Sequence, residues 1–135
     1  DITLHRAFDM TRDPFAALEA AVRLGCRTIL TSGQARNALE GAELLGELVR
    51  RAAGRIEIMA GCGVRKENIR AIHQRAGIRA FHTTGGGAPL DSGMLYRKPG
   101  VSMGLPSLPE YELRQTGRQE FEACARVVHA LGGAD

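Results

Sequence analysis

The sequence predicts an α/β fold in which parallel strands alternate with helices. Short apolar runs at residues 2–4, 28–30, 56–59 and 80–82 are separated by stretches whose apolar residues recur with helical spacing. The strand starts lie about 25 to 28 residues apart over the first three units. Because strands that alternate with helices are joined by right-handed crossovers, we expect them to lie parallel in one sheet.

The predicted helices are delimited by capping residues. Asp13 and Pro14 provide an N-cap and a first-turn proline for the first helix. The second helix is predicted to begin at about residue 37, and the last to cover residues 115–131. Glycines suited to a helix C-terminus follow the first three: Gly25, Gly54 and Gly77.

Residues 84–110 form a long predicted loop rich in glycine and proline. Long loops in compact domains are commonly functional, so this loop is a candidate lid over a ligand site. Hydrogen exchange with and without ligand tests the idea, since equal, fast exchange in both states contradicts a lid.

Three features favour a (β/α)8 barrel, the TIM barrel, over a doubly wound sheet. The unit spacing is regular, no glycine fingerprint with a downstream acidic residue is present, and small or polar residues close every strand. A complete barrel needs about 250 residues, whereas this chain has 135 and opens on Asp1 rather than Met. We therefore expect one partial domain over 1–135, a half-barrel completed by missing upstream sequence or by a second copy of the chain.

Composition excludes several classes of protein. The net charge is only +3, and the basic residues are scattered without interleaved aromatics, which argues against nucleic-acid binding. No apolar run approaches the roughly 18 residues that span a bilayer, and no signal peptide is evident. The three cysteines are odd in number and widely spaced, so a reducing cytoplasm is the expected location.

An ordered series of short motifs resembles the CutC family, known as copper homeostasis proteins. The series includes residues 3–9 (TLHRAFD), 29–33 (ILTSG), 58–64 (IMAGCGV) and 91–94 (DSGM), and the match weakens after about residue 106. The resemblance implies a cytoplasmic TIM barrel of which this chain is the C-terminal half, equivalent to strands five to eight, with copper as its possible metal. Two segments depart from the family pattern: Met59 to Gly63, usually Met-Pro-Gly-Gly-Gly, and Thr83 to Gly87.

A polar cluster follows the first predicted strand. His5 could act as acid, base or ligand, Arg6 as an anion clamp and Asp9 as the group that orients it. These three are the candidate catalytic residues, because ligands bind where barrel strands end. The alternative is that Arg6 and Asp9 form a pair that only fixes the loop.

Hydroxyls and glycines after the other strands suggest anion binding. Backbone amides in glycine turns can approach a ligand closely, and helix N-termini favour anions. The alternative is ordinary turn chemistry. The candidate anion ligands are Thr31, Ser32, Gly33, Gly61, Gly63 and Thr83.

Cys62 and His82 are the candidate metal ligands, because thiolate and imidazole suit Cu(I) or Zn(II). With His5 they could converge from separate strands, although their spacing matches no closed metal motif. The alternative is an unligated thiol in a glycine turn. Three functions therefore stay open: a copper-handling protein, an enzyme of unknown reaction on a small anionic or phosphorylated ligand, and a fragment inactive on its own.

Overall fold

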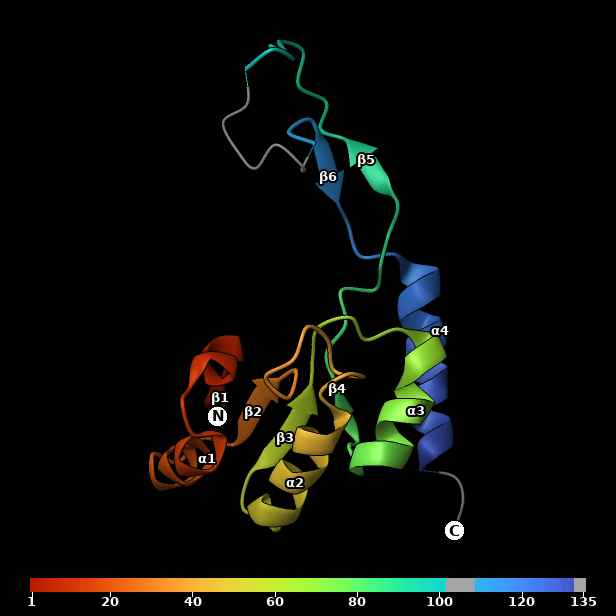
Figure 1. Ribbon diagram of the computed structural model, residues 1–135. Coiled ribbons are helices and arrows are strands. Elements are labelled where there is room, and N and C mark those ends of the chain that lie inside the picture. Colours follow the sequence, from red (N-terminus) through yellow and green to blue (C-terminus); the bar gives the residue numbers. More distant parts are fainter. Residues whose placement is uncertain (102–108, 133–135) are drawn as a thin grey trace.

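The computed structural model describes residues 1–101 and 109–132. Its main sheet has the strand order β1 (Thr3–Leu4), β2 (Thr28–Thr31), β3 (Glu57–Ala60) and β4 (Ala80–Phe81), as Figure 1 shows. Each neighbouring pair is parallel. The predicted α/β fold with a parallel sheet is confirmed.

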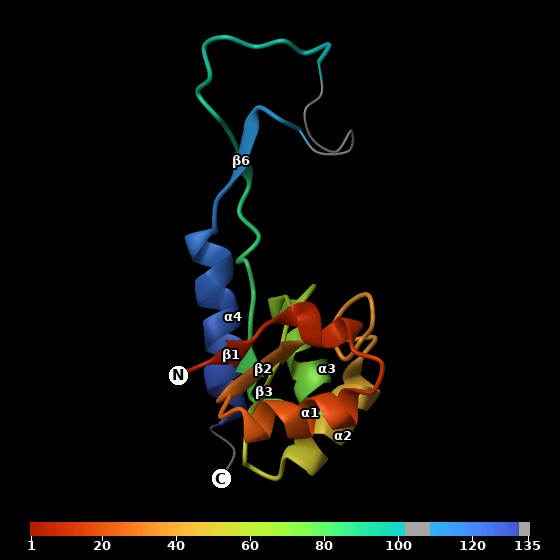
Figure 2. The same cartoon turned by 90° about the vertical axis from the view of Figure 1, so that its left-hand side faces the viewer.

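Three helices and a short 3-10 helix connect these strands. They are the 3-10 helix η1 (Arg6–Met10), α1 (Pro14–Arg23), α2 (Ala42–Ala52) and α3 (Lys66–Ala76). The Asp13 carboxylate caps α1 by accepting hydrogen bonds from the amides of Phe15 and Ala16, as its sequence position predicts. In Figure 2, α1, α2 and α3 lie on the same side of the sheet.

Helix α2 begins five residues later than the sequence suggests. The Asn37 side-chain oxygen accepts hydrogen bonds from the amides of Leu39 and Glu40 at 3.1 and 3.0 Å. Asparagine stabilises turns in this way, and here the turn delays the helix until Ala42.

Side chains alternate between the two faces of the sheet. Ile29 is paired with Ile58, and Thr31 with Ala60, and all four side chains are buried on the helical side. Leu30 and Met59 alternate onto the opposite face and are only half-buried. The fully buried aliphatic core includes Leu18, Ile29, Leu45, Leu48, Ile69, Ile72 and Ile78.

Beyond β4 the chain forms an arm and then a final helix. The arm contains an antiparallel pair, β5 (Pro89–Asp91) and β6 (Glu112–Arg114), in and just after the segment predicted as a loop. Figure 1 shows it standing away from the main sheet. Helix α4 (Arg118–Leu131) then packs along α3. In the part of the chain that the structure describes, every helix is too short or too polar to cross a membrane.

Candidate functional site

The Asp9 carboxylate is the centre of a hydrogen-bonded cluster at the carboxyl ends of β1 and β2. It lies in η1, and its side chain is only 8% exposed. It accepts hydrogen bonds from the hydroxyl and backbone donors of the loop after β2, namely the Thr31 hydroxyl and the amides of Ser32 and Gln34. One carboxylate thus ties the segment after β1 to the segment after β2.

Arg6 completes this cluster from the solvent side. Its Nε donates to Asp9 Oδ2 at 2.7 Å, and its Nη2 donates to the Ser32 hydroxyl at 3.1 Å. The Ser32 oxygen also lies 3.0 Å from Asp9 Oδ2 and 2.8 Å from the Ala35 carbonyl, so its single proton serves one of these acceptors at a time. The Arg6 side chain is nevertheless 43% exposed, which leaves a fixed guanidinium facing solvent.

The pKa values of this pair follow from these contacts. Burial raises the pKa of Asp9, but the hydrogen bonds from Thr31, Arg6, Ser32 and Gln34 outweigh burial and hold that pKa below its ordinary value. The hydrogen bond to Asp9 raises the pKa of Arg6, with a smaller contribution from the nearby Cys62. Asp9 is therefore a carboxylate and Arg6 a cation over the whole neutral range.

The predicted anion ligands after β2 face inward. Thr31 and Ser32 are fully buried, and their hydroxyls are engaged with Asp9 and with the loop itself. Gly33 is buried against Gly41. Thr31 and Ser32 thus hold Asp9 in place, and the Gly33 amide donates to the Thr31 hydroxyl.

The turn after β3 brings Cys62 to the same cluster. Gly61 is packed beneath Leu30, since a Cβ atom there would lie 2.5 Å from Leu30 Cδ1. Cys62 has a positive φ of 76°, and its thiol donates to the Arg36 carbonyl at 3.1 Å. Gly63 lies at the surface of this turn, beside the Asn37 side chain.

The two candidate histidines have different surroundings. His5 Nδ1 accepts a hydrogen bond from the amide of Ala7, which caps η1. Neutral His5 therefore holds its proton on Nε2. His82 and Thr83 line a polar cavity of about 490 Å³ at the end of β4, and the Thr83 hydroxyl donates to the Val64 carbonyl.

The chemistry of these donors does not fit a complete copper site. Among residues 1–101 and 109–132, no group of three or more His, Cys, Asp or Glu side chains lies close enough to hold a metal ion. The Cys62 thiol is engaged with the Arg36 carbonyl and lies near the Arg6 cation. The positive charge of Arg6 disfavours the binding of a second cation, such as a copper ion, at Cys62.

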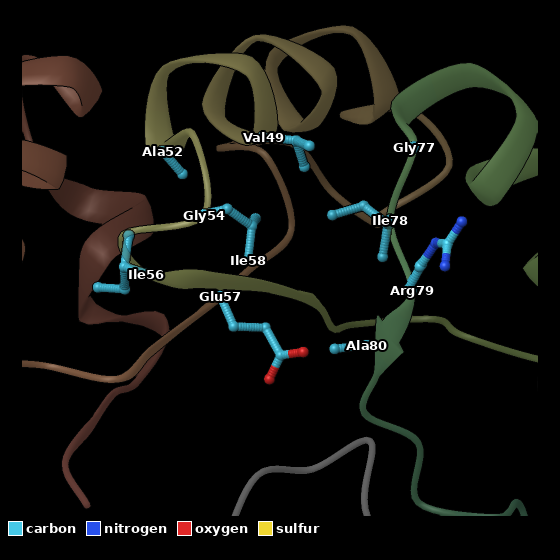
Figure 3. Close-up of a pocket in the computed structure, with 10 residues that line it drawn as sticks. All are labelled: Val49, Ala52, Gly54, Ile56, Glu57, Ile58, Gly77, Ile78, Arg79 and Ala80. Atoms are coloured by element: carbon cyan, nitrogen blue, oxygen red, sulfur yellow. The ribbon is translucent and has the colours of Figure 1, made fainter.

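A second cavity, of about 340 Å³, lies at the amino ends of β3 and β4. Figure 3 shows Val49 and Ile78 on the α2 side of β3, whereas the Glu57 carboxylate lies on the opposite side. Its lining is mainly aliphatic, and it lies at the end of the sheet remote from Arg6. In (β/α) folds this end supports stability, while chemistry occurs at the carboxyl ends of the strands.

Three residues of the strand-end region were not predicted from the sequence. Gln34 donates its amide to Asp9 and its side chain to Thr11. Arg65 and Arg114 line the cavity at the end of β4. Gln34 directly follows the ILTSG segment, residues 29–33, and this position could have marked it as a residue of the site. Arg65 and Arg114 are far apart in the sequence, and no sequence pattern links them.

Comparison with known proteins identifies the family. Residues 1–87 match the CutC family. This chain belongs to the CutC family. A CutC family protein of Parabacteroides distasonis is 49% identical over 123 residues, which are 90% of this chain and 50% of that relative. A CutC family protein of Chromobacterium violaceum is 42% identical over 122 residues, 90% of this chain and 49% of the relative.

A solved CutC structure agrees with the observed fold. This protein from Streptococcus agalactiae, named for copper homeostasis, is 34% identical and matches with a TM-score of 0.56 over 59% of this chain and 40% of its own length. The CutC resemblance predicted from the sequence is confirmed. The chain spans about half the length of the curated CutC relatives it matches.

Proposed function

We propose that the strand ends around Arg6 bind a small anionic ligand. The observation that carries this proposal is a guanidinium fixed by Asp9 and Ser32 yet 43% exposed. An arginine has five N–H donors, and the bonds to Asp9 and Ser32 use one from Nε and one from Nη2. A prepositioned and partly exposed guanidinium suits carboxylate and phosphate groups.

The Arg6→Gln variant tests this proposal. We expect inorganic phosphate to bind about tenfold more weakly, because one charge-assisted contact is lost, while the protein stays folded with a lower thermal stability, because Asp9 loses its ion pair. NMR titration should locate the binding through the amide shifts of Ser32, Gly33 and Cys62.

Arg12→Gln is the matched control, since Arg12 is an exposed arginine outside the cluster. Equal weakening in both variants, or amide shifts that leave this loop unchanged, would contradict a site at Arg6.

Copper binding is the second candidate function, favoured by the copper homeostasis name of the similar structure. Cys62 carries a soft thiol at the same strand ends, and thiolates select Cu(I). Because the described residues form no complete site, we propose that Cys62 supplies one donor and that the others lie outside this cluster.

The copper proposal predicts a loss of Cu(I) binding in Cys62→Ser. Titration against a competing chelator should show at least a tenfold weaker affinity, about 1.4 kcal/mol. Cys26→Ser is the control, because Cys26 is also a half-buried free cysteine. Unchanged Cu(I) binding in Cys62→Ser would remove this proposal.

We also propose that the four βα units form half of a TIM barrel, equivalent to strands five to eight. The parallel order β1–β2–β3–β4 and the half-length match to CutC relatives support this assignment. A cytoplasmic location is proposed on the chemistry of Cys26, Cys62 and Cys124, which are all free thiols.

A further inference from the structure

The polar cavity at the end of β4 lies where the chain leaves for the arm and returns from it. The outgoing residues 83–87 pass the returning residues 114–117 between the first turns of α3 and α4 (Figure 1). The outgoing and returning segments are in backbone contact there, since a Cβ atom on Gly87 would lie only 1.9 Å from the Gln115 carbonyl oxygen. Tight packing at this crossing gives the cavity of about 490 Å³ a defined wall.

Two arginines from different elements line this cavity. Arg65 precedes α3, and Arg114 ends β6. The Arg65 side chain makes one long hydrogen bond, 3.4 Å, to the Val64 carbonyl, and Arg114 is an exposed residue of β6. The cavity is therefore lined by two exposed arginines, of which Arg65 also acts on Glu67 through its charge.

The other lining groups are suited to an anion. Thr84 and Thr116 add hydroxyl groups, and no Asp or Glu is present among the described lining residues. The acidic side chain of Glu120 lies beside the cavity, since its Cγ is 3.9 Å from the position of a Cβ on Gly86. Its carboxylate is paired with Lys66, so Lys66 offsets its negative charge.

We propose that this cavity binds the phosphoryl group of a small phosphorylated molecule. Two guanidinium groups and the hydroxyls of the same lining match the charge and the several acceptor oxygens of a phosphate monoester. The volume exceeds that of a lone phosphate and lies in the range of small-molecule sites. This ligand site is separate from the Arg6 cluster at β1 and β2.

Titration of the full chain with glycerol 3-phosphate and inorganic phosphate tests the proposal. Binding should shift the amide resonances of Thr84, Gly86, Gly87 and Thr116, while glycerol alone should shift none of them. Arg114→Gln and Arg65→Gln should each weaken glycerol 3-phosphate binding about tenfold or more, because each removes a charge-assisted contact. The two variants lie in different elements, so a local disturbance of the arm cannot account for both losses.

Arg126→Gln is the control with the same charge change on the exposed surface of α4, and it should bind as the wild type does. Arg6→Gln should also leave these shifts unchanged, which separates this site from the one proposed at β1 and β2. Absence of shifts in residues 84–87 and 114–117, or equal weakening in the Arg126 variant, overturns the proposal.

Discussion

Asp9→Asn is expected to lower the free energy of unfolding by about 2–3 kcal/mol. The side-chain amide keeps one oxygen but replaces the other with a donor, so it cannot accept from Arg6 and Ser32 as the carboxylate does. The buried Thr31 hydroxyl and the Ser32 amide would then compete for one uncharged acceptor. Urea denaturation followed by circular dichroism measures the change.

Asp91→Asn is the matched control for this substitution. Asp91 pairs with Arg97 in the exposed arm, and exposed pairs contribute at most about 1 kcal/mol. An Asp9 variant as stable as the Asp91 variant would show that the cluster does not stabilise the fold.

The acid sensitivity of the fold should also depend on Asp9. Its pKa is held below the ordinary value of 3.8, so its stabilisation is fully present above that pH. The stabilisation is lost as the pH falls through the lower pKa of the folded state. The Asp9→Asn variant should lack this contribution, so the difference in free energy of unfolding between the unmodified chain and the variant should shrink as the pH falls below 3.8. A difference that stays constant over this range would contradict the assignment.

We propose that the chain associates through the face of the sheet opposite α1, α2 and α3. Leu30 and Met59 are half-buried on that face, and a barrel would cover them with its other half. In a solution of the purified chain, we expect a second copy of the chain to cover this face. Analytical ultracentrifugation should therefore give a mass above that of one 14.5 kDa chain.

Leu30→Glu should return the chain to a monomer, because burying a leucine contributes about 1.5–3 kcal/mol and a buried carboxylate opposes it. Leu24→Glu is the control, since Leu24 is 76% exposed after α1. A folded, stable monomer of the unmodified chain at all concentrations would refute the association.

Local sequence signals predicted the parts of the fold that depend on local interactions. Asp13 and Pro14 predicted the start of α1, and alternating apolar runs predicted four parallel strands. Arg6 and Asp9 are three residues apart, and the ion pair that the sequence offered as the alternative to a catalytic role is present at 2.7 Å. These features need only neighbouring residues or a repeated pattern.

Features that depend on distant contacts were not predicted. The hydroxyls of Thr31 and Ser32 were candidate ligand donors, but Asp9, more than twenty residues earlier, occupies them. The pairing of β5 with β6 also joins distant residues, and its side chains are exposed, so no apolar alternation marks it. Arg65 and Arg114 line the same cavity at the end of β4 because the arm returns the chain to this point.

The backbone contact between Gly87 and Gln115 closes the base of the arm and separates it from the rest of the fold. Helix α4 is held by its packing on α3, so we expect a change in the length of the arm beyond the crossing to leave α4 in place. We therefore expect that the arm can be lengthened, shortened or replaced while the main sheet and its helices keep their arrangement.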